Sequence, residues 1–241
     1  LDDGSTDNTR EVIGPYLSRL KYVRHDNMGE TRTVNEGYRI CNGDIVGVVN
    51  SDDPLYARDA ITCIVDCFKS NPEALAVYPD WVSIDETGKV IGEYAQPNFS
   101  IDTMLMDFNT TLGPGMFIKR TALEMLGFRN KNLRFTGDLD LSFRLALAGS
   151  LAHVPRFLAT HRVHSNAASA TAKGAVMAQE VIRLAESSLA SPLLPPSLVR
   201  NHRRILANAH FDASFFCGEN SLLKRQYRSK ALFLGPDVII A

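Results

Sequence analysis

The chain has 241 residues, of which 45% are hydrophobic and 22% charged, proportions typical of a globular protein with one large core. Its 26 Lys and Arg residues nearly balance its 27 Asp and Glu residues, and the net charge of -1 gives no reason to expect nucleic acid as a partner. The sequence contains no run of about 18 apolar residues and no signal-peptide pattern, so we expect neither a membrane span nor an export signal in it.

Up to about residue 165, short apolar runs alternate with helical patterns, which is typical of an α/β sandwich. The chain opens with Leu1 before the polar turn Asp2-Asp3-Gly4-Ser5 and has no starting Met, so we expect that a strand is cut near its end and that upstream sequence is missing. The first half predicts a helix over residues 10–19, a short strand from residue 23, a helix over 30–41, a buried central strand over 44–50, a helix over 57–69 and a strand over 75–78.

The pattern then changes, because two short apolar runs, 81–84 and 89–92, flank the turn Asp85-Glu86-Thr87-Gly88 and predict a hairpin. We therefore expect a mixed but mostly parallel sheet. A strand over 115–119, helices over 121–126 and 139–148 and a strand over 153–162 complete this part, and helices over 175–189 and 197–217 follow. The sequence predicts an α/β domain over residues 1–166, with its first strand and helix missing, and a helical C-terminal appendage over residues 167–241.

Two pairs of carboxylates stand directly after predicted strands, Asp2 with Asp3 and Asp52 with Asp53. Ligands of open α/β sheets bind beyond the carboxyl ends of the parallel strands. Adjacent carboxylates repel each other unless a cation lies near, and a divalent cation that carries a diphosphate meets this need. The pattern favours a metal–nucleotide site, and the alternative is two turns whose Asp residues cap the following helices. Neither a P-loop nor a G-x-G-x-x-G motif offers another phosphate site.

A third candidate is Asp138, at the start of the predicted helix over 139–148. A carboxylate there is either a plain helix cap or a base that takes a proton from an attacking hydroxyl group. Asp140 lies about 200° further around the helix and cannot face the same cleft, so we choose Asp138. His164 follows the last predicted strand, where it is either a surface or core residue or a ligand of a metal or diphosphate, because imidazole binds manganese well.

The order of these motifs resembles that of the family 2 glycosyltransferases, inverting enzymes with the GT-A fold. The likeness covers roughly residues 1–169 and rests on the ordered set Asp2-Asp3-Gly4-Ser5-Thr6-Asp7-Asn8-Thr9, Asn27-Met28-Gly29, Asn35-Glu36-Gly37, Gly43-Asp44-Ile45, Asn50-Ser51-Asp52-Asp53, Gly137-Asp138 and Arg144. The family's early P-x-Y-N-like segment is absent, which fits the expected N-terminal truncation.

The resemblance implies a role for each carboxylate. Asp2 and Asp3 would lie by the nucleotide base and ribose, and Asp52 nearer the ribose or diphosphate. Asp53 would be the preferred direct ligand of a divalent metal, Mn²⁺ or Mg²⁺. Asp138 would be the base that deprotonates the acceptor hydroxyl group.

Three positions depart from the family pattern. Gly137 replaces the usual Glu before the base, and Asn50 stands where many members have the first Asp of D-x-D. Val34 occupies the place of an Arg near the base in some relatives, so Arg32 is our candidate for that purpose and is counted with the nucleotide-binding residues. The segment Arg162-Val163-His164 resembles a late R-x-H element of the family, so His164 is counted with Asp53 as a metal ligand.

The implied function is the transfer of a sugar, with inversion, from a nucleotide-diphosphate donor to a hydroxyl acceptor in polysaccharide or cell-envelope synthesis. UDP-sugars are the family's commonest donors, and its acceptors are saccharides, lipid-linked carriers or proteins. The alternatives are a nucleotidyltransferase and a non-catalytic module that binds nucleotide sugars or acts as a scaffold.

The sequence also bears on location. The four cysteines lack metal-ligand spacing and are predicted to be reduced core residues, which favours the cytoplasm. A position at the inner face of the membrane fits the implied function, with the C-terminal helices as a peripheral contact; their packing against the core is the alternative.

Overall fold

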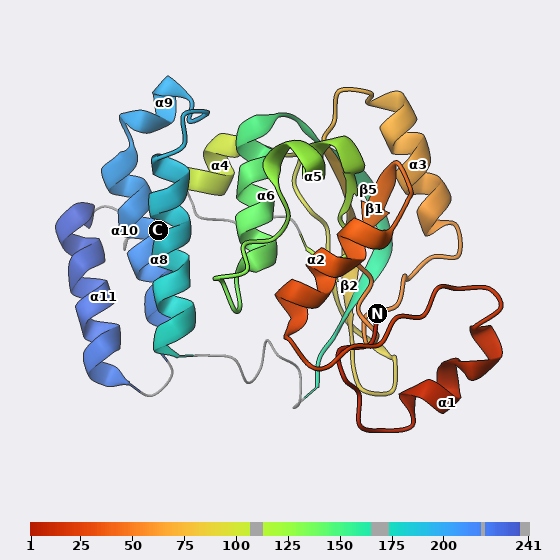
Figure 1. Ribbon diagram of the computed structural model, residues 1–241. Helices are drawn as coiled ribbons and strands as arrows, with labels where there is room; N and C mark the ends of the chain where they lie inside the picture. The colour runs from red at the N-terminus through yellow and green to blue at the C-terminus, as the bar shows by residue number, and fades with distance from the viewer. Residues whose placement is uncertain (107–112, 165–173, 218–219, 237–241) are drawn as a thin grey trace.

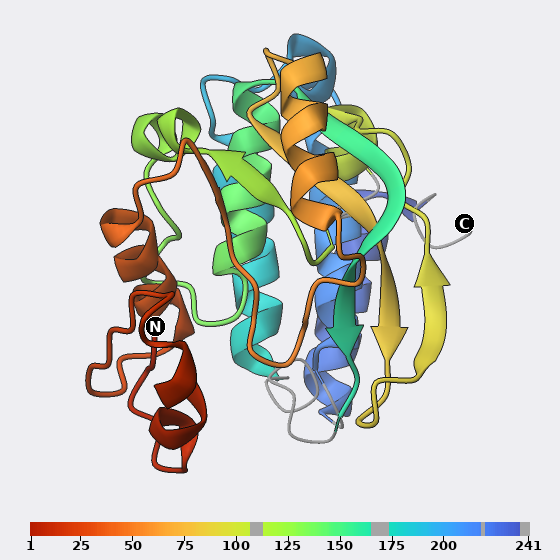
Figure 2. The ribbon, with the colours of Figure 1, turned by 90° about the vertical axis from the view of Figure 1, so that its right-hand side faces the viewer.

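Figure 1 shows the computed structural model, which describes residues 1–106, 113–164, 174–217 and 220–236. A central sheet has helices on both faces (Figure 1, Figure 2). Its described strands are β1 (Ile45–Gly47), β2 (Ala76–Ile84), β3 (Val90–Tyr94), β4 (Phe117–Lys119) and β5 (Leu151–Arg162). The predicted α/β fold class is confirmed.

Strand β2 is the centre of the described sheet. It pairs with β5 in parallel from Ala76 to Ile84, and its other edge pairs antiparallel with β4 near its start and with β3 near its end. Strand β1 pairs antiparallel with β4. Strands β1, β2 and β5 therefore run in one direction and β3 and β4 in the other. The sheet is mixed, as predicted, although β2 with β5 is the one parallel pairing among the named strands of the described residues.

Each face of the sheet is covered by helices with an apolar side. Helix α3 (Ala60–Ser70) packs on one face, where its buried residues meet apolar side chains of β2, β4 and β5: Ala60, Ile64, Phe68, Val77, Phe117, Val154 and Leu158. The other face belongs to a larger core that includes residues of α2 (Glu30–Ile40) and α6 (Gly137–Ala148), among them Tyr38 and Leu145. Burial of these side chains stabilises the layers by roughly 1.5–3 kcal/mol for each large apolar residue.

The C-terminal helices are α8 (Ala175–Leu189), α9 (Pro196–Val199), α10 (His202–Phe215) and α11 (Ser221–Leu234). Helix α8 has the predicted bounds, and the predicted helix over 197–217 is divided into α9 and α10. Buried residues of α8 and α10, such as Leu184 and Ile205, belong to the same core cluster as the sheet. Figure 1 shows these helices beside α6. The division at residues 166 and 167 stays a prediction, and both positions lie outside the described residues.

The N-terminal part departs from the prediction. Helix α1 covers only Thr9–Ile13 and continues as a 3₁₀-helix over Gly14–Tyr16. Pro15 lacks a backbone N–H and cannot continue the α-helical hydrogen bonds, which explains the early end. The predicted strand from residue 23 is reduced to one parallel bridge between Asp2 and Arg24.

The predicted buried central strand over 44–50 was wrong in length and position. Strand β1 covers Ile45–Gly47 and has β4 as its one neighbour in the described part of the sheet. Val46 is buried, whereas Val49 is 49% exposed. Continuous apolar content indicated burial on both faces, but an edge position buries fewer of these residues.

Two further differences concern the middle of the chain. The runs predicted as separate strands, 75–78 and 81–84, form the single strand β2, whose hairpin with β3 is as expected. Helix α4 (Ile101–Met106) was not predicted, and α5 (Arg120–Leu126) lies one residue earlier than expected at its start.

Candidate active site

One large cleft is lined by several segments of the α/β part and by the start of α8. It has a volume of about 1440 Å³, and its lining comes from segments 27–32, 48–55, 113–118, 129–142, 159–162 and 174–177. Four predicted site residues line it: Arg32, Asp52, Asp53 and Asp138. Asp2, Asp3 and His164 are not among the lining residues, but Asp3 and His164 bond to residues that are.

Asp2 orders the first turn of the chain. Its side chain is buried and accepts hydrogen bonds from the Ser5 backbone N–H, at 2.7 Å, and from the Tyr22 hydroxyl group. These bonds, with the nearby Arg24 cation, lower the pKa of Asp2 to about 2. The carboxylate therefore stays ionised and holds this segment together. Its predicted nucleotide contact stays a prediction.

Asp3 holds the segment that leads into α2. Its two carboxylate oxygens accept the backbone N–H groups of Met28 at 2.7 Å and Gly29 at 3.0 Å. The close contact between the turn at residues 2–5 and Asn27 depends on Gly4, which has φ of 77°. A Cβ atom added at this residue would lie 2.8 Å from the Asn27 backbone nitrogen. A side chain at residue 4 would therefore strain this turn.

Asp52 and Asp53 meet the end of β5. Asp53 Oδ1 accepts the Arg162 backbone N–H at 2.6 Å, and its Oδ2 accepts the Asn50 side-chain amide at 3.1 Å. Asp52 Oδ2 lies 3.2 Å from His164 Nε2. His164, one of the two predicted metal ligands, thus lies beside Asp52, which precedes the other predicted ligand, Asp53, in the sequence. Within the described residues, no group of three or more His, Cys, Asp or Glu side chains is placed to hold a metal ion.

Asp138 is the second residue of α6 and faces the cleft. Its Oδ1 accepts the Leu139 backbone N–H at 2.8 Å. Desolvation by the surrounding protein raises the pKa of Asp138 above its ordinary value, and the Arg129 cation opposes this rise. A carboxylate with a raised pKa accepts a proton more readily than an ordinary Asp.

Sequence reasoning assigned no role to Arg129. Its Nη1 donates to Glu30 Oε1 at 2.7 Å, and its backbone is held by Asn35, which accepts from Arg129 N at 2.9 Å and donates to Arg129 O at 2.8 Å. The positive charge of Arg129 lowers the pKa of Asp138, and the role expected for Arg32 stays a prediction. These partners are separated by 94 to 99 residues, and no local pattern marks them.

Asp140 and Arg144 form a separate structural pair. Asp140 is buried, and its Oδ2 lies 2.7 Å from Arg144 Nη2. Arg144 also donates to the carbonyl oxygens of Leu126 and Phe128, each at 2.8 Å, and so satisfies the C-terminal end of α5. Neither the Asp140 nor the Arg144 side chain lines the cleft, in agreement with the choice of Asp138 over Asp140.

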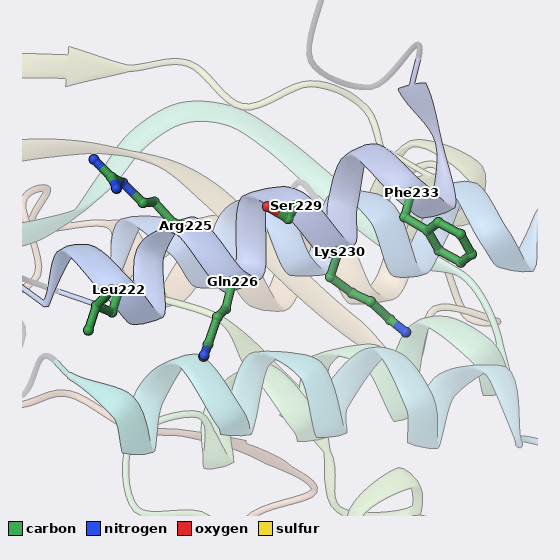
Figure 3. Close-up of a pocket in the computed structure, with 6 residues that line it drawn as sticks. All are labelled: Leu222, Arg225, Gln226, Ser229, Lys230 and Phe233. Atoms are coloured by element: carbon green, nitrogen blue, oxygen red, sulfur yellow. The ribbon is translucent and has the colours of Figure 1, made fainter.

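A second hollow of about 590 Å³ runs along α11 (Figure 3). Its lining is Leu222, Arg225, Gln226, Ser229, Lys230 and Phe233. None of these is a carboxylate or a predicted site residue, so we place the candidate site in the large cleft.

Among the described residues, every helix is too short or too polar to span a lipid bilayer.

Two bacterial synthases are similar to this chain in sequence. Chondroitin synthase of Escherichia coli is 27% identical over 167 residues, which make up 68% of this chain and 24% of the relative. Poly-beta-1,6-N-acetyl-D-glucosamine synthase of Staphylococcus aureus is 26% identical over 160 residues, 62% of this chain and 38% of the relative. The chain therefore spans well under half the length of these two relatives.

Solved structures share the fold at low sequence identity. S. aureus TarS matches with a TM-score of 0.69 and 15% identity over 99% of this chain and 70% of the other; a TarS complex with UDP matches with a TM-score of 0.62. The mannosyltransferase PcManGT from Pyrobaculum calidifontis, in complex with GDP-Man and Mn²⁺, matches with a TM-score of 0.61 and 16% identity over 100% of this chain and 65% of the other.

The family model for glycosyl transferase family 2 matches residues 1–125. The match includes both carboxylate pairs and ends before Asp138. Because it covers more than half of the 241 residues, the chain belongs to glycosyl transferase family 2.

Proposed function

We propose that the protein transfers a sugar from a nucleoside diphosphate donor to a hydroxyl group of a saccharide acceptor, with inversion at the anomeric carbon. The observation that carries this proposal is that Asp52, Asp53 and Asp138 line one cleft, although they come from the loop after β1 and from the start of α6. One part of the cleft can hold a metal-bound diphosphate, and another offers a base. Membership in the family supports the same reaction class.

Asp53 and His164 are the residues that would hold a divalent cation, with oxygen atoms of the donor diphosphate as its further ligands. Carboxylate oxygens and imidazole suit Mn²⁺, and Mg²⁺ needs only one or two carboxylates when substrate phosphates complete its coordination. A carboxylate has about four lone-pair sites, and the two bonds that Asp53 accepts leave others for a cation. When bound, the cation would stabilise negative charge on the leaving diphosphate.

Asp138 would take the proton of the acceptor hydroxyl group. The acceptor oxygen then bonds to the anomeric carbon as the bond from that carbon to the diphosphate oxygen breaks, so one displacement inverts the configuration. A direct displacement needs no covalent enzyme intermediate. Asp138 is exposed and lines the cleft, so an acceptor hydroxyl group can reach its carboxylate.

The donor and acceptor classes rest on relatives. Two of the solved structures hold a nucleoside diphosphate or its sugar, UDP in TarS and GDP-Man in PcManGT. The two sequence relatives named above are polysaccharide synthases. We propose a UDP-sugar donor and a saccharide acceptor, with GDP-mannose as the alternative donor.

The test is calorimetric titration of UDP-N-acetylglucosamine, UDP-glucose and GDP-mannose into the protein with and without MnCl₂, followed by assay of nucleotide release. The proposal expects one donor to bind in a metal-dependent manner and to be turned over. Asp53→Ala should abolish binding, whereas Asp66→Asn, on the exposed surface of α3, should leave it unchanged. Metal-dependent binding without turnover would favour the non-catalytic module. Transfer of a nucleotidyl group would favour the nucleotidyltransferase.

A further inference from the structure

Glu180 of α8 is a buried carboxylate that binds the segment in front of the proposed base. The residue is 3% exposed. Its Oε1 accepts the backbone N–H of Arg134 at 2.7 Å, and its Oε2 accepts those of Phe135 at 2.9 Å and Thr136 at 3.1 Å. The Thr136 hydroxyl group also donates to Oε2, at 3.2 Å. Three consecutive backbone N–H groups and one side chain thus converge on one carboxylate.

Glu is seldom fully buried, because burial of its charge is costly unless hydrogen bonds or an ion pair compensate for the lost contact with water. Hydrogen bonds to an ionised acceptor are shorter and roughly twice as strong as bonds between neutral groups. Three successive N–H groups held by one side chain also fix the backbone path of the segment. Glu180 therefore constrains the conformation of residues 134–136 more than apolar packing would.

The held segment leads directly to Asp138. Thr136 is completely buried and is the N-cap residue of α6, and its carbonyl oxygen accepts the Asp140 N–H at 2.9 Å, the first hydrogen bond of that helix. Asp138 follows two residues after Thr136. Because residues 137–148 follow regular α-helical geometry, the position of Thr136 sets where the backbone of Asp138 lies at the cleft.

Three other features connect this segment and Glu180 to the site. On the opposite side of the segment, the Thr31 hydroxyl group of α2 donates to the Leu133 carbonyl oxygen at 3.3 Å, so the segment is held between α2 and α8. Arg134 and Phe135 themselves line the cleft. The negative charge of Glu180 also lies near the N-terminal end of α6, where the helix dipole favours an anion.

We infer that Glu180 is a positioning residue of the transferase site: it holds residues 134–136 and so orients Asp138 toward the acceptor. This inference rests on the proposed function for the catalytic part of its claim. Helix α8 lies beyond residues 1–125, which the family model matches. If Glu180 positions Asp138, this helix contributes to the function of the site.

The experiment compares the full chain with three variants. Glu180→Gln keeps the size of the side chain but presents an NH₂ group to backbone N–H donors. Glu180→Asp keeps the charge and both acceptors on a shorter side chain. Leu184→Ala, one turn further along the same buried side of α8, removes apolar packing without touching residues 134–136 and serves as the matched control.

Three quantities are measured on each protein: amide hydrogen exchange of peptides that cover residues 134–139, kcat for nucleotide release from the turned-over donor, and the Kd for UDP with MnCl₂. For Glu180→Gln we expect faster exchange at residues 134–136 and a fall in kcat of roughly 10- to 100-fold, the scale of a misplacement by about 1 Å. The Kd for UDP should stay within about twofold, because Asp52 and Asp53 are held by other contacts. For Glu180→Asp we expect hydrogen exchange at residues 134–136 and kcat to lie between the values of Glu180→Gln and the wild type.

Leu184→Ala should lower the melting temperature while leaving the exchange at residues 134–136 and kcat close to wild type. The inference is overturned if folded Glu180→Gln keeps wild-type exchange and kcat. It is also overturned if Leu184→Ala loses as much kcat as Glu180→Gln at an equal loss of melting temperature. If the wild type turns over no donor, the proposed function fails instead, and the exchange data still decide whether Glu180 holds the segment.

Discussion

Asp53 accepts the backbone N–H of Arg162 at 2.6 Å and so joins the loop after β1 to the end of β5 across 109 residues of sequence. Arg162 strengthens the same junction by donating from Nε to the Asp52 carbonyl oxygen at 2.9 Å. The carboxylate proposed to bind the metal therefore also supports the fold. These two roles can be separated by substitution.

Asp53→Ala and Asp53→Asn should both abolish metal-dependent nucleotide binding, because neither retains the charge that a cation needs. Only Asp53→Ala should also lower stability, by about 1–3 kcal/mol, because it leaves the Arg162 N–H without an acceptor while Asn keeps an oxygen there. Calorimetric titration and chemical denaturation of the two variants measure these effects. Equal stability of the two variants would contradict the structural role.

Asp138→Asn should lower kcat by roughly 10²- to 10⁴-fold, the usual contribution of a general base. Nucleotide binding should change little, because Asp138 lies on α6 and not in the loop with Asp52 and Asp53. Steady-state assays and titration with UDP and MnCl₂ separate the two effects. A variant that loses nucleotide binding together with turnover would argue against a role as base.

Arg129 should set the pH at which Asp138 works. Its positive charge lowers the pKa of Asp138 against the rise caused by desolvation, so Arg129→Met should raise that pKa further. The base must be deprotonated to act, and a higher pKa moves the acidic limb of the kcat profile to higher pH. Arg129→Lys keeps the charge and should shift the limb less. A profile that is unchanged in Arg129→Met would contradict this coupling.

Asp2 should make stability depend on pH in the acid range. Its pKa is lowered from 3.8 to about 2 in the folded chain, so its contribution is present above pH about 4 and is lost as the pH falls to about 2. Tyr22→Phe removes the largest cause of the lowered pKa and should flatten the pH dependence in this range. Denaturation curves at several pH values test this. Asp2→Asn, which cannot ionise, should remove the contribution of this residue entirely.

The sequence alone determined the local elements and the order of the motifs. The helical composition of residues 175–189 predicted α8 with its observed bounds, and the predicted helix over 30–41 differs from α2 by one residue. Asp52 and Asp53 could be singled out because they follow an apolar strand pattern, and Asp138 because it stands at the start of a helical pattern. Each of these patterns is formed by residues that lie close together in the sequence.

Tertiary structure decided what surrounds those residues. The edge position of β1 depends on its pairing with β4, and Val49 is exposed although it belongs to the apolar run over residues 45–49. The hydrogen bond between Arg129 and Glu30 joins residues that are 99 positions apart in the sequence. The bond between Thr136 and Glu180 joins residues that are 44 positions apart. Periodicity and capping patterns report the backbone over one or two turns, whereas the partner of a buried charge is set by how separate helices and strands pack. The candidate carboxylates were therefore readable from the sequence, and the groups that hold and tune them were not.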